Sequence, residues 1–215
     1  MVMLYLDTCV TVIFMLHSLP YIFIEQGALL VMVAVRQKTQ LLYWSSVHSP
    51  RGECIVMATE DGVCWTGTPG TAVDEGLFRT KHWVQVERVV RGEKVPALQQ
   101  AVDELQRYFA GEQIQFSCQL DLRGTPFQVL VWQELCRIPY GETRSYGEIA
   151  RTIGRPSASR AVGAANGANP IAIIVPCHRV IGSNGSLTGY GGGLPTKEWL
   201  LSLERGLSIK HLDLA

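Results

Sequence analysis

Residues 145–180 read SYGEIARTIGRPSASRAVGAANGANPIAIIVPCHRV and hold the strongest structural signals of this chain. The stretch Ser145-Tyr-Gly-Glu148 has the form of a capping box, which predicts a short helix that ends at Gly154. We expect Ser157 to cap a second helix and Asn169-Pro170 to stop it, because the residue before a proline avoids helical geometry. Two short helices joined by a tight turn are typical of a helix-turn-helix motif.

The second of these helices is rich in small side chains. A glycine in a helix costs about 1 kcal/mol relative to alanine, so another interaction should compensate. One explanation is tight packing against another helix. The other is a close approach to nucleic acid, since a minor groove about 6 Å wide admits only a slim helix, from which Arg160 would project. The small residues are Ala158, Ala161, Gly163, Ala164, Ala165, Gly167 and Ala168.

A cysteine beside a histidine follows this helix. Ile171–Val175 is predicted to be a buried strand, and Pro176-Cys177-His178 comes directly after it. A bare Cys-His pair is more often core packing than chemistry. Here its place after a rigid proline, an apolar strand and a candidate DNA-reading helix favours a reactive thiol, which a histidine–carboxylate relay could convert to the nucleophilic thiolate. The glycine-rich stretch Gly189–Gly193 either closes over a flat ligand or is a flexible surface loop.

Upstream of these signals the pattern predicts a small α/β unit. Cys54–Thr59 and Val63–Thr66 flank a Glu-Asp-Gly turn and indicate a hairpin. His82–Val90 is rich in β-branched residues and is expected to be a further strand. A helix with one apolar face begins at Pro96 and is closed by Gly111.

Arg123-Gly124 is the expected boundary between two domains. Thr125-Pro-Phe-Gln128 is another capping box and opens an apolar helix. A last helix should start at Pro195 or Thr196 and end at Gly206.

The net charge does not indicate a class of binding partner, because 19 basic side chains balance 19 acidic ones. Its distribution says more. Residues 1–124 hold 10 basic and 13 acidic side chains, whereas residues 125–207 hold 8 and 5. The stretch 144–179 alone contains five arginines and one glutamate, which points to a surface that binds a polyanion.

The six cysteines are scattered and form no CxxC pair, which argues against a disulfide scaffold, a zinc ribbon or a redox pair. His48, His82, Cys54 and Cys64 do not fall at metal-ligand spacing. Reduced thiols in a cytoplasmic protein are the simplest interpretation.

The N-terminal segment is strongly apolar, since residues 8–35 contain Glu25 as their single charged side chain. A signal peptide is poorly supported, because no basic region precedes the segment and no cleavage motif follows it. About 20 apolar residues suffice to span a bilayer, which leaves a membrane anchor open, although Pro20 and Glu25 interrupt the run. We favour an unusual leader, or upstream sequence read from an early start, with the domain beginning near Met32 or Tyr43.

Six sequence blocks occur in a fixed order between residues 125 and 207. They are Pro139-Tyr-Gly-Glu-Thr143, Ser145-Tyr-Gly-Glu148, Arg160-Ala-Val-Gly163, Asn169-Pro170, Pro176-Cys-His-Arg-Val180 and the stretch from Gly193 to Glu204. Together they resemble the O6-alkylguanine-DNA alkyltransferases, also called methylated-DNA–protein-cysteine methyltransferases. The resemblance is weaker over residues 43–124 and does not cover residues 1–40.

The resemblance implies an α/β N-terminal domain and a mostly helical, winged helix-turn-helix-like C-terminal domain. The first would be a small ribonuclease H-like domain at 43–123. The second would be the DNA-binding alkyltransferase domain with the active-site cysteine at 124–207. Residues 1–42 are then an apolar extension of unknown role, and residues 208–215 are a tail.

The resemblance also implies catalytic roles. Cys177 would accept the alkyl group, His178 would be the general base through a water, and Glu204 would orient the imidazole. Asn169 would brace the turn before the active site. Tyr146 would help to rotate the nucleotide and would donate a hydrogen bond to the departing guanine.

For DNA, the resemblance makes Arg160 the finger that fills the space left by the flipped nucleotide. The implied DNA-binding set is Arg160, Ser157, Ala161 and Tyr146, and the implied substrate pocket is Tyr190, Gly191 and Val175. Gly191 stands where some relatives have a serine, so a backbone donor alone would remain there and the preferred alkyl size is open.

The implied partner is double-stranded DNA that contains O6-alkylguanine, with O4-methylthymine as a further candidate. Neither a nucleotide nor another cofactor is expected, and the protein should act as a monomer. Some relatives bind a structural zinc in the N-terminal domain. Thr59 and Cys64 occupy two of the aligned positions, so we expect no metal here.

Three other functions fit parts of the sequence. The main alternative is a non-catalytic alkyltransferase-like protein that binds DNA lesions, but such proteins replace the residue at Cys177. A helix-turn-helix regulator would leave the Pro-Cys-His-Arg block unexplained. A thiol hydrolase could use Cys177, His178 and Glu204, but the basic helices would then be idle.

Overall fold

The computed structural model describes residues 2–6, 9–16, 19–26, 29–34, 39–92 and 95–206. It separates into two compact units, Met1–Thr39 and Gln40–Ala215. The expected tail at 208–215 lies outside the described residues.

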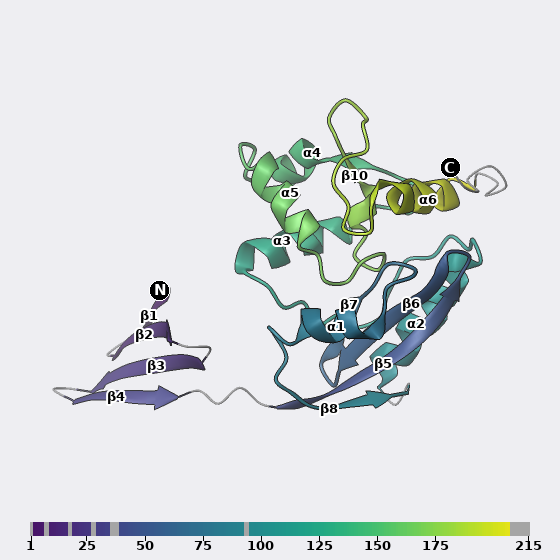
Figure 1. Cartoon of the computed structure of the whole chain (residues 1–215). Coiled ribbons are helices and arrows are strands. Elements are labelled where there is room, and N and C mark those ends of the chain that lie inside the picture. The colour runs from purple at the N-terminus through teal and green to yellow at the C-terminus, as the bar shows by residue number, and fades with distance from the viewer. Residues whose placement is uncertain are drawn as a thin grey trace. The chain divides into compact units, whose positions relative to one another are not determined.

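The first unit is a four-stranded antiparallel sheet with the strand order β1-β2-β3-β4 (Figure 1). Its apolar runs form strands, and Pro20 pairs with Met15. Among the described residues, no helix is both long and apolar enough to cross a bilayer. The strands are β1 (Val2–Leu6), β2 (Cys9–Leu16), β3 (Leu19–Gln26) and β4 (Leu29–Ala34).

The second unit begins with a mixed four-stranded sheet in the order β7-β6-β5-β8. The predicted hairpin is confirmed, because β6 pairs antiparallel with β7 and Gly62 has a φ of +139° at the turn. The predicted strand at 82–90 starts late, since the amides of Trp83 and Val84 both bond to the Thr80 carbonyl and continue the turn after α1. The elements are β5 (Gln40–Ser49), β6 (Gly52–Thr59), β7 (Gly62–Thr66), α1 (Val73–Thr80), β8 (Val86–Arg91) and α2 (Pro96–Phe109).

The two helices of this region cover opposite faces of the sheet (Figure 1). Along β6, Ile55 and Met57 pack with the side chains of α1, whereas Cys54, Val56 and Ala58 pack with those of α2. This alternation follows from the period of two along a strand. The α2 side of the core continues without a break into the apolar residues of the C-terminal half, residues 124–206.

The C-terminal half is mainly helical, as expected. Both predicted capping boxes form: Thr125 begins α3 and Ser145 begins α4, each with its reciprocal side-chain bond. The fold class predicted from the sequence is therefore confirmed. The elements are α3 (Pro126–Leu135), β9 (Arg144–Ser145), α4 (Tyr146–Thr152), α5 (Ser159–Gly167), the 3₁₀ helix η1 (Cys177–Arg179), β10 (Val180–Ile181) and α6 (Leu194–Glu204).

Two local predictions are wrong. Ser157 does not cap α5, because the Ala158 amide bonds back to the Arg155 carbonyl and the helix starts two residues later. Ile171–Val175 is buried but is not a strand. Its chain turns at Ile173, which has a φ of 72°, so the apolar run packs as a compact turn.

Ser145 caps a helix and Ser157 does not, and this difference can be tested by measuring the stability of alanine variants. Ser145→Ala removes a cap and should lower the free energy of unfolding by about 1 kcal/mol. Ser157→Ala should change it by less than about 0.5 kcal/mol, because Ser157 is exposed and caps nothing. Urea denaturation of both variants measures the difference, and equal losses would contradict the assigned helix start.

Candidate active site and nucleic-acid interface

Cys177 opens the short helix η1, directly after the turn at 171–175. Asn169 holds this turn from within, because its Nδ2 donates to the Val175 carbonyl at 2.8 Å and its Oδ1 accepts from the Ile171 amide at 3.0 Å. The N-terminal half holds it from outside. The Thr66 amide donates to the Pro170 carbonyl at 3.0 Å, and the Thr66 hydroxyl donates to the Ala172 carbonyl at 2.9 Å.

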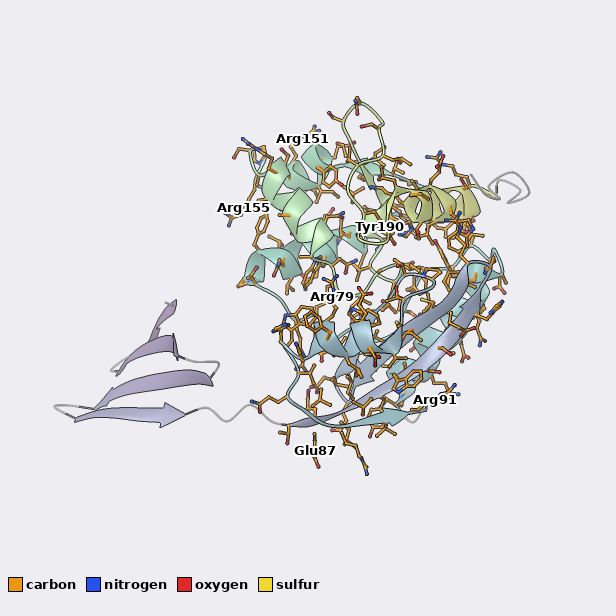
Figure 2. All side chains as sticks on the ribbon, viewed as in Figure 1. Arg79, Glu87, Arg91, Arg151, Arg155 and Tyr190 are labelled. Carbon is orange, nitrogen blue, oxygen red and sulfur yellow. The ribbon has the colours of Figure 1, made fainter. Side chains whose placement is uncertain are left out.

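Cys177 is 5% exposed and lines a cavity of about 360 Å³. One wall comes from the C-terminal half and includes Asn169, Tyr190 and Gly191. In Figure 2, Tyr190 lies on the loop between β10 and α6. Val175 is fully buried and does not line the cavity, so its link to the site is the carbonyl held by Asn169. The opposite wall comes from the N-terminal half and includes Trp65, Thr68, Phe78 and Trp83.

The resting sulfur is a protonated thiol. Burial raises the pKa of Cys177, although the Asn169 side chain and the charge of Lys197 act in the opposite direction. Lys197 is itself buried, and burial lowers its pKa to about 8. Nucleophilic attack therefore requires a base that removes the thiol proton when substrate is bound.

His178 and Glu204 form a buried pair that could supply this base. His178 Nε2 lies 2.7 Å from Glu204 Oε1, and both side chains are inaccessible to solvent. A carboxylate only accepts, so Nε2 carries the proton and Nδ1 has a free lone pair. Nδ1 is buried and has no partner among the described residues. Burial lowers the pKa of His178, which keeps the ring neutral and able to accept a proton.

The Glu204 carboxylate receives donors from four residues in three segments of the chain. Beside His178, these are the Arg179 guanidinium at 2.9 Å, the Tyr108 hydroxyl at 2.8 Å and the Gly141 amide at 3.1 Å. Burial alone would raise the pKa of Glu204, but the hydrogen bonds from His178 and Arg179 and the charge of Arg179 outweigh it and lower the pKa to about 2.

Several of these residues were not identified from the sequence. Arg179 is part of the Pro-Cys-His-Arg-Val block and could have been assigned as the carboxylate's partner. Lys197 donates to the carbonyls of Val180 and Thr188, and Asn166 donates to the Cys177 carbonyl at 3.3 Å. Tyr108 lies 96 residues before Glu204, so no local spacing could have indicated it.

The expected DNA-binding residues lie on α4, on α5 and on the turn that joins them. Arg160, Ser157 and Ala161 are exposed, and the described part of the chain offers the Arg160 side chain no hydrogen bond or ion pair. Tyr146 is half-buried and donates to the Thr188 carbonyl at 3.2 Å. Figure 2 shows Arg151 and Arg155 on the outer side of these helices.

The glycines of α5 are not required by packing. A Cβ at Gly167 would meet nothing within 4 Å, and one at Gly163 would make ordinary contact with the Tyr146 ring at 3.7 Å. Ala161 and Ala164 are exposed as well. Helix–helix packing therefore does not account for these exposed small residues, whereas Ala165 is buried and belongs to the core.

Within residues 39–92 and 95–206, no three His, Cys, Asp or Glu side chains converge as metal ligands. Thr59 donates instead to Asp121 at 2.9 Å. The Cys64 thiol lies 3.6 Å from the Met57 carbonyl, and burial raises its pKa to about 12.

The Glu204 carboxylate should dominate the stability of the C-terminal half. Glu204→Gln would leave the buried Arg179 without its counter-charge and should lower the free energy of unfolding by roughly 3 kcal/mol or more at pH 7. Glu198→Gln on the same helix is exposed and should change it by less than about 0.5 kcal/mol.

The difference in the free energy of unfolding between wild type and Glu204→Gln should become smaller as the pH falls. The folded pKa of Glu204, about 2, lies below the value of about 4.3 for an unfolded chain. Its contribution is therefore complete above about pH 4.3 and is lost as the pH falls toward 2. Urea denaturation at several pH values should show wild type and Glu204→Gln converging in acid. A constant gap would contradict the assigned pKa.

Comparison with known proteins places both halves in one family. The ribonuclease-like domain of 6-O-methylguanine DNA methyltransferase matches residues 42–122, and the DNA-binding domain of the same family matches residues 126–206. A methylated-DNA–protein-cysteine methyltransferase of Methanosarcina acetivorans is 47% identical over 167 residues, which cover 76% of this chain and 98% of that protein. The Mycobacterium tuberculosis enzyme of that name is 65% identical over 114 residues, which cover 53% of this chain and 69% of the relative.

A solved structure agrees. The M. tuberculosis OGT protein in complex with DNA has a TM-score of 0.65 and 46% identity, over 77% of this chain and 94% of that one. The two domain matches together span most of this sequence, and the fold, the cysteine site and the relatives agree. The chain therefore belongs to the 6-O-methylguanine DNA methyltransferase family.

Proposed function

We propose that this protein repairs DNA by direct reversal, moving the alkyl group from the O6 atom of guanine irreversibly onto Cys177. The observation that carries the proposal is the Cys177 thiol at a cavity wall, next to a histidine that keeps one unpaired basic nitrogen and is anchored by a buried carboxylate. Membership of the methyltransferase family supplies the reaction class.

The proposed step is an in-line displacement at the alkyl carbon. The thiol proton passes to His178 Nδ1 through a water, and the sulfur then forms a bond to carbon as the bond from carbon to O6 breaks. The electron pair of that bond leaves with guanine. Glu204 stabilises the imidazolium that forms, and a donor near the base must stabilise or protonate the guanine anion.

The substrate guanine must first leave the duplex, because its O6 substituent cannot reach a thiol inside the base stack. We assign the exposed Arg160 as the side chain that fills the gap, with Ser157 and Ala161 on the surface that meets the backbone. We assign Tyr146 as the residue that helps to rotate the nucleotide and then donates to the base.

Tyr190 and Gly191 would contact the extruded base. The Tyr190 hydroxyl is buried and has no partner among the described residues, so it is available to a ligand. Gly191 is exposed and could offer only its backbone amide. Val175 would contribute indirectly, through the turn that Asn169 braces.

The thioether product is stable, and we infer that one molecule repairs one lesion. We expect a monomer, and we expect that transfer needs no cofactor because Cys177 itself accepts the alkyl group. We further propose a cytoplasmic location, residues 43–123 and 124–207 as the two working domains, and residues 1–42 as an extension outside them. All five cysteines between residues 54 and 177 are free thiols, a state that a reducing compartment would maintain.

The direct test is label transfer. When the protein is mixed with duplex DNA carrying O6-[³H-methyl]guanine, label should move to protein in a burst that stops at one methyl group per molecule. Peptide mapping should find the label on Cys177. Continued turnover would indicate a hydrolase, and tight binding without transfer would indicate a lesion-binding protein.

Cys177→Ala is the matched control for this experiment. It should abolish transfer and leave the affinity for the modified duplex within about threefold, because the proposed DNA contacts lie on α4, α5 and the turn between them. Loss of transfer and binding together would mean that the cysteine is structural.

The proposed role of Arg160 predicts a substrate-dependent defect. Arg160→Ala should slow transfer from duplex DNA by about tenfold or more, since an unfilled gap leaves part of the unstacking cost of a few kcal/mol uncompensated. Transfer from free O6-benzylguanine should be nearly unchanged. Single-turnover rates with the two substrates give the comparison, and equal slowing would exclude the finger role.

A further inference from the structure

We propose that Tyr108, a residue of the ribonuclease-like half, is a positioning residue that sets the basicity of His178 through the carboxylate of Glu204. The inference rests on the proposed role of His178 as the base. It gives the N-terminal half a part in the chemistry, although that half contributes no group to the transfer itself.

Tyr108 and His178 share one oxygen atom. The Tyr108 hydroxyl donates to Glu204 Oε1 at 2.8 Å, and His178 Nε2 donates to the same oxygen at 2.7 Å. The Arg179 guanidinium also donates to this oxygen, at 2.9 Å, and donors on one oxygen compete for its electron density. The hydrogen bond from Tyr108 therefore weakens the interaction of the carboxylate with the imidazole, and a weaker interaction makes Nδ1 less basic.

The hydroxyl of Tyr108 is fixed in this position. The residue is completely buried, and its ring contacts Phe109 at 5.5 Å, Phe116 at 5.6 Å and Tyr140 at 6.1 Å between ring centroids. Burial, followed by the charge of Glu204, raises the pKa of Tyr108 well above its usual range. The phenol therefore remains a donor across the working pH range.

Other groups also face the His178–Glu204 pair. Arg179 bonds both carboxylate oxygens, and Lys197 disfavours a charged His178 from α6. Cys177 and the phenols of Tyr140 and Tyr190 lie in the same electrostatic neighbourhood. Tyr108 differs from the two cations because it is neutral, so its hydroxyl can be removed without changing the charge of the site.

The experiment is a pH profile of single-turnover transfer from the O6-methylguanine duplex to Cys177, over about pH 5 to 9. Tyr108→Phe should move the acid limb to higher pH by about half a unit, because a carboxylate with one donor fewer holds the imidazolium more strongly. Tyr140→Phe is the matched control. Tyr140 packs against the Tyr108 ring, but its hydroxyl makes no hydrogen bond to Glu204 among the described contacts. The pH profile of Tyr140→Phe should therefore overlay that of wild type.

A second variant separates positioning from packing. Replacing Tyr108 by 3-fluorotyrosine keeps the ring and makes the phenol a stronger donor, so the acid limb should move to lower pH, opposite to Tyr108→Phe. If Tyr108→Phe does not fold, the fluorinated protein alone decides. If every folded variant still transfers the methyl group and the midpoint of its acid limb equals that of wild type, this inference is overturned and the proposed function remains intact. Absence of transfer from wild type at every pH refutes the proposed function itself.

Discussion

The buried carboxylate of Glu204 is the constraint on which the C-terminal half depends. A buried anion is costly unless its lone pairs are filled, and here donors from α2, the 139–141 turn and η1 fill them. Those donors come from segments far apart in sequence, so the charge can be satisfied only when the whole arrangement is assembled. The same bonds orient the histidine beside the reactive sulfur, which links the stability of the fold to the geometry of the site.

The protonation states of the site follow from this arrangement. Burial keeps both the Cys177 thiol and the His178 ring neutral in the free protein. The nucleophile is therefore protected until a substrate completes the site and a proton can move between two neutral groups. The histidine–carboxylate relay that we expected from the sequence fits this geometry. A Cys177 thiolate that is already ionised in the free protein does not fit it, because burial raises the pKa of the thiol.

Much of the architecture could be predicted because its signals are local. The capping boxes at Thr125 and Ser145 and the turn glycine at Gly62 each fix an element through contacts within a few residues. The failures have a common cause in contacts that lie farther apart. The 171–175 turn was mistaken for a strand because its apolar residues are buried, but bonds from Asn169 and Thr66 determine its path. Tyr108 was missed because its partner is on another domain.

The two hydrogen bonds that Thr66 makes to the carbonyls of Pro170 and Ala172 explain why a domain without reactive groups would be retained beside the alkyltransferase domain. They tie a rigid sheet edge to the segment that presents the sulfur. The sequence of the sheet would thus be selected for how precisely it positions the Cys177 sulfur. A substitution that loosens β7 would lower the rate of transfer before it measurably lowers the stability of the fold.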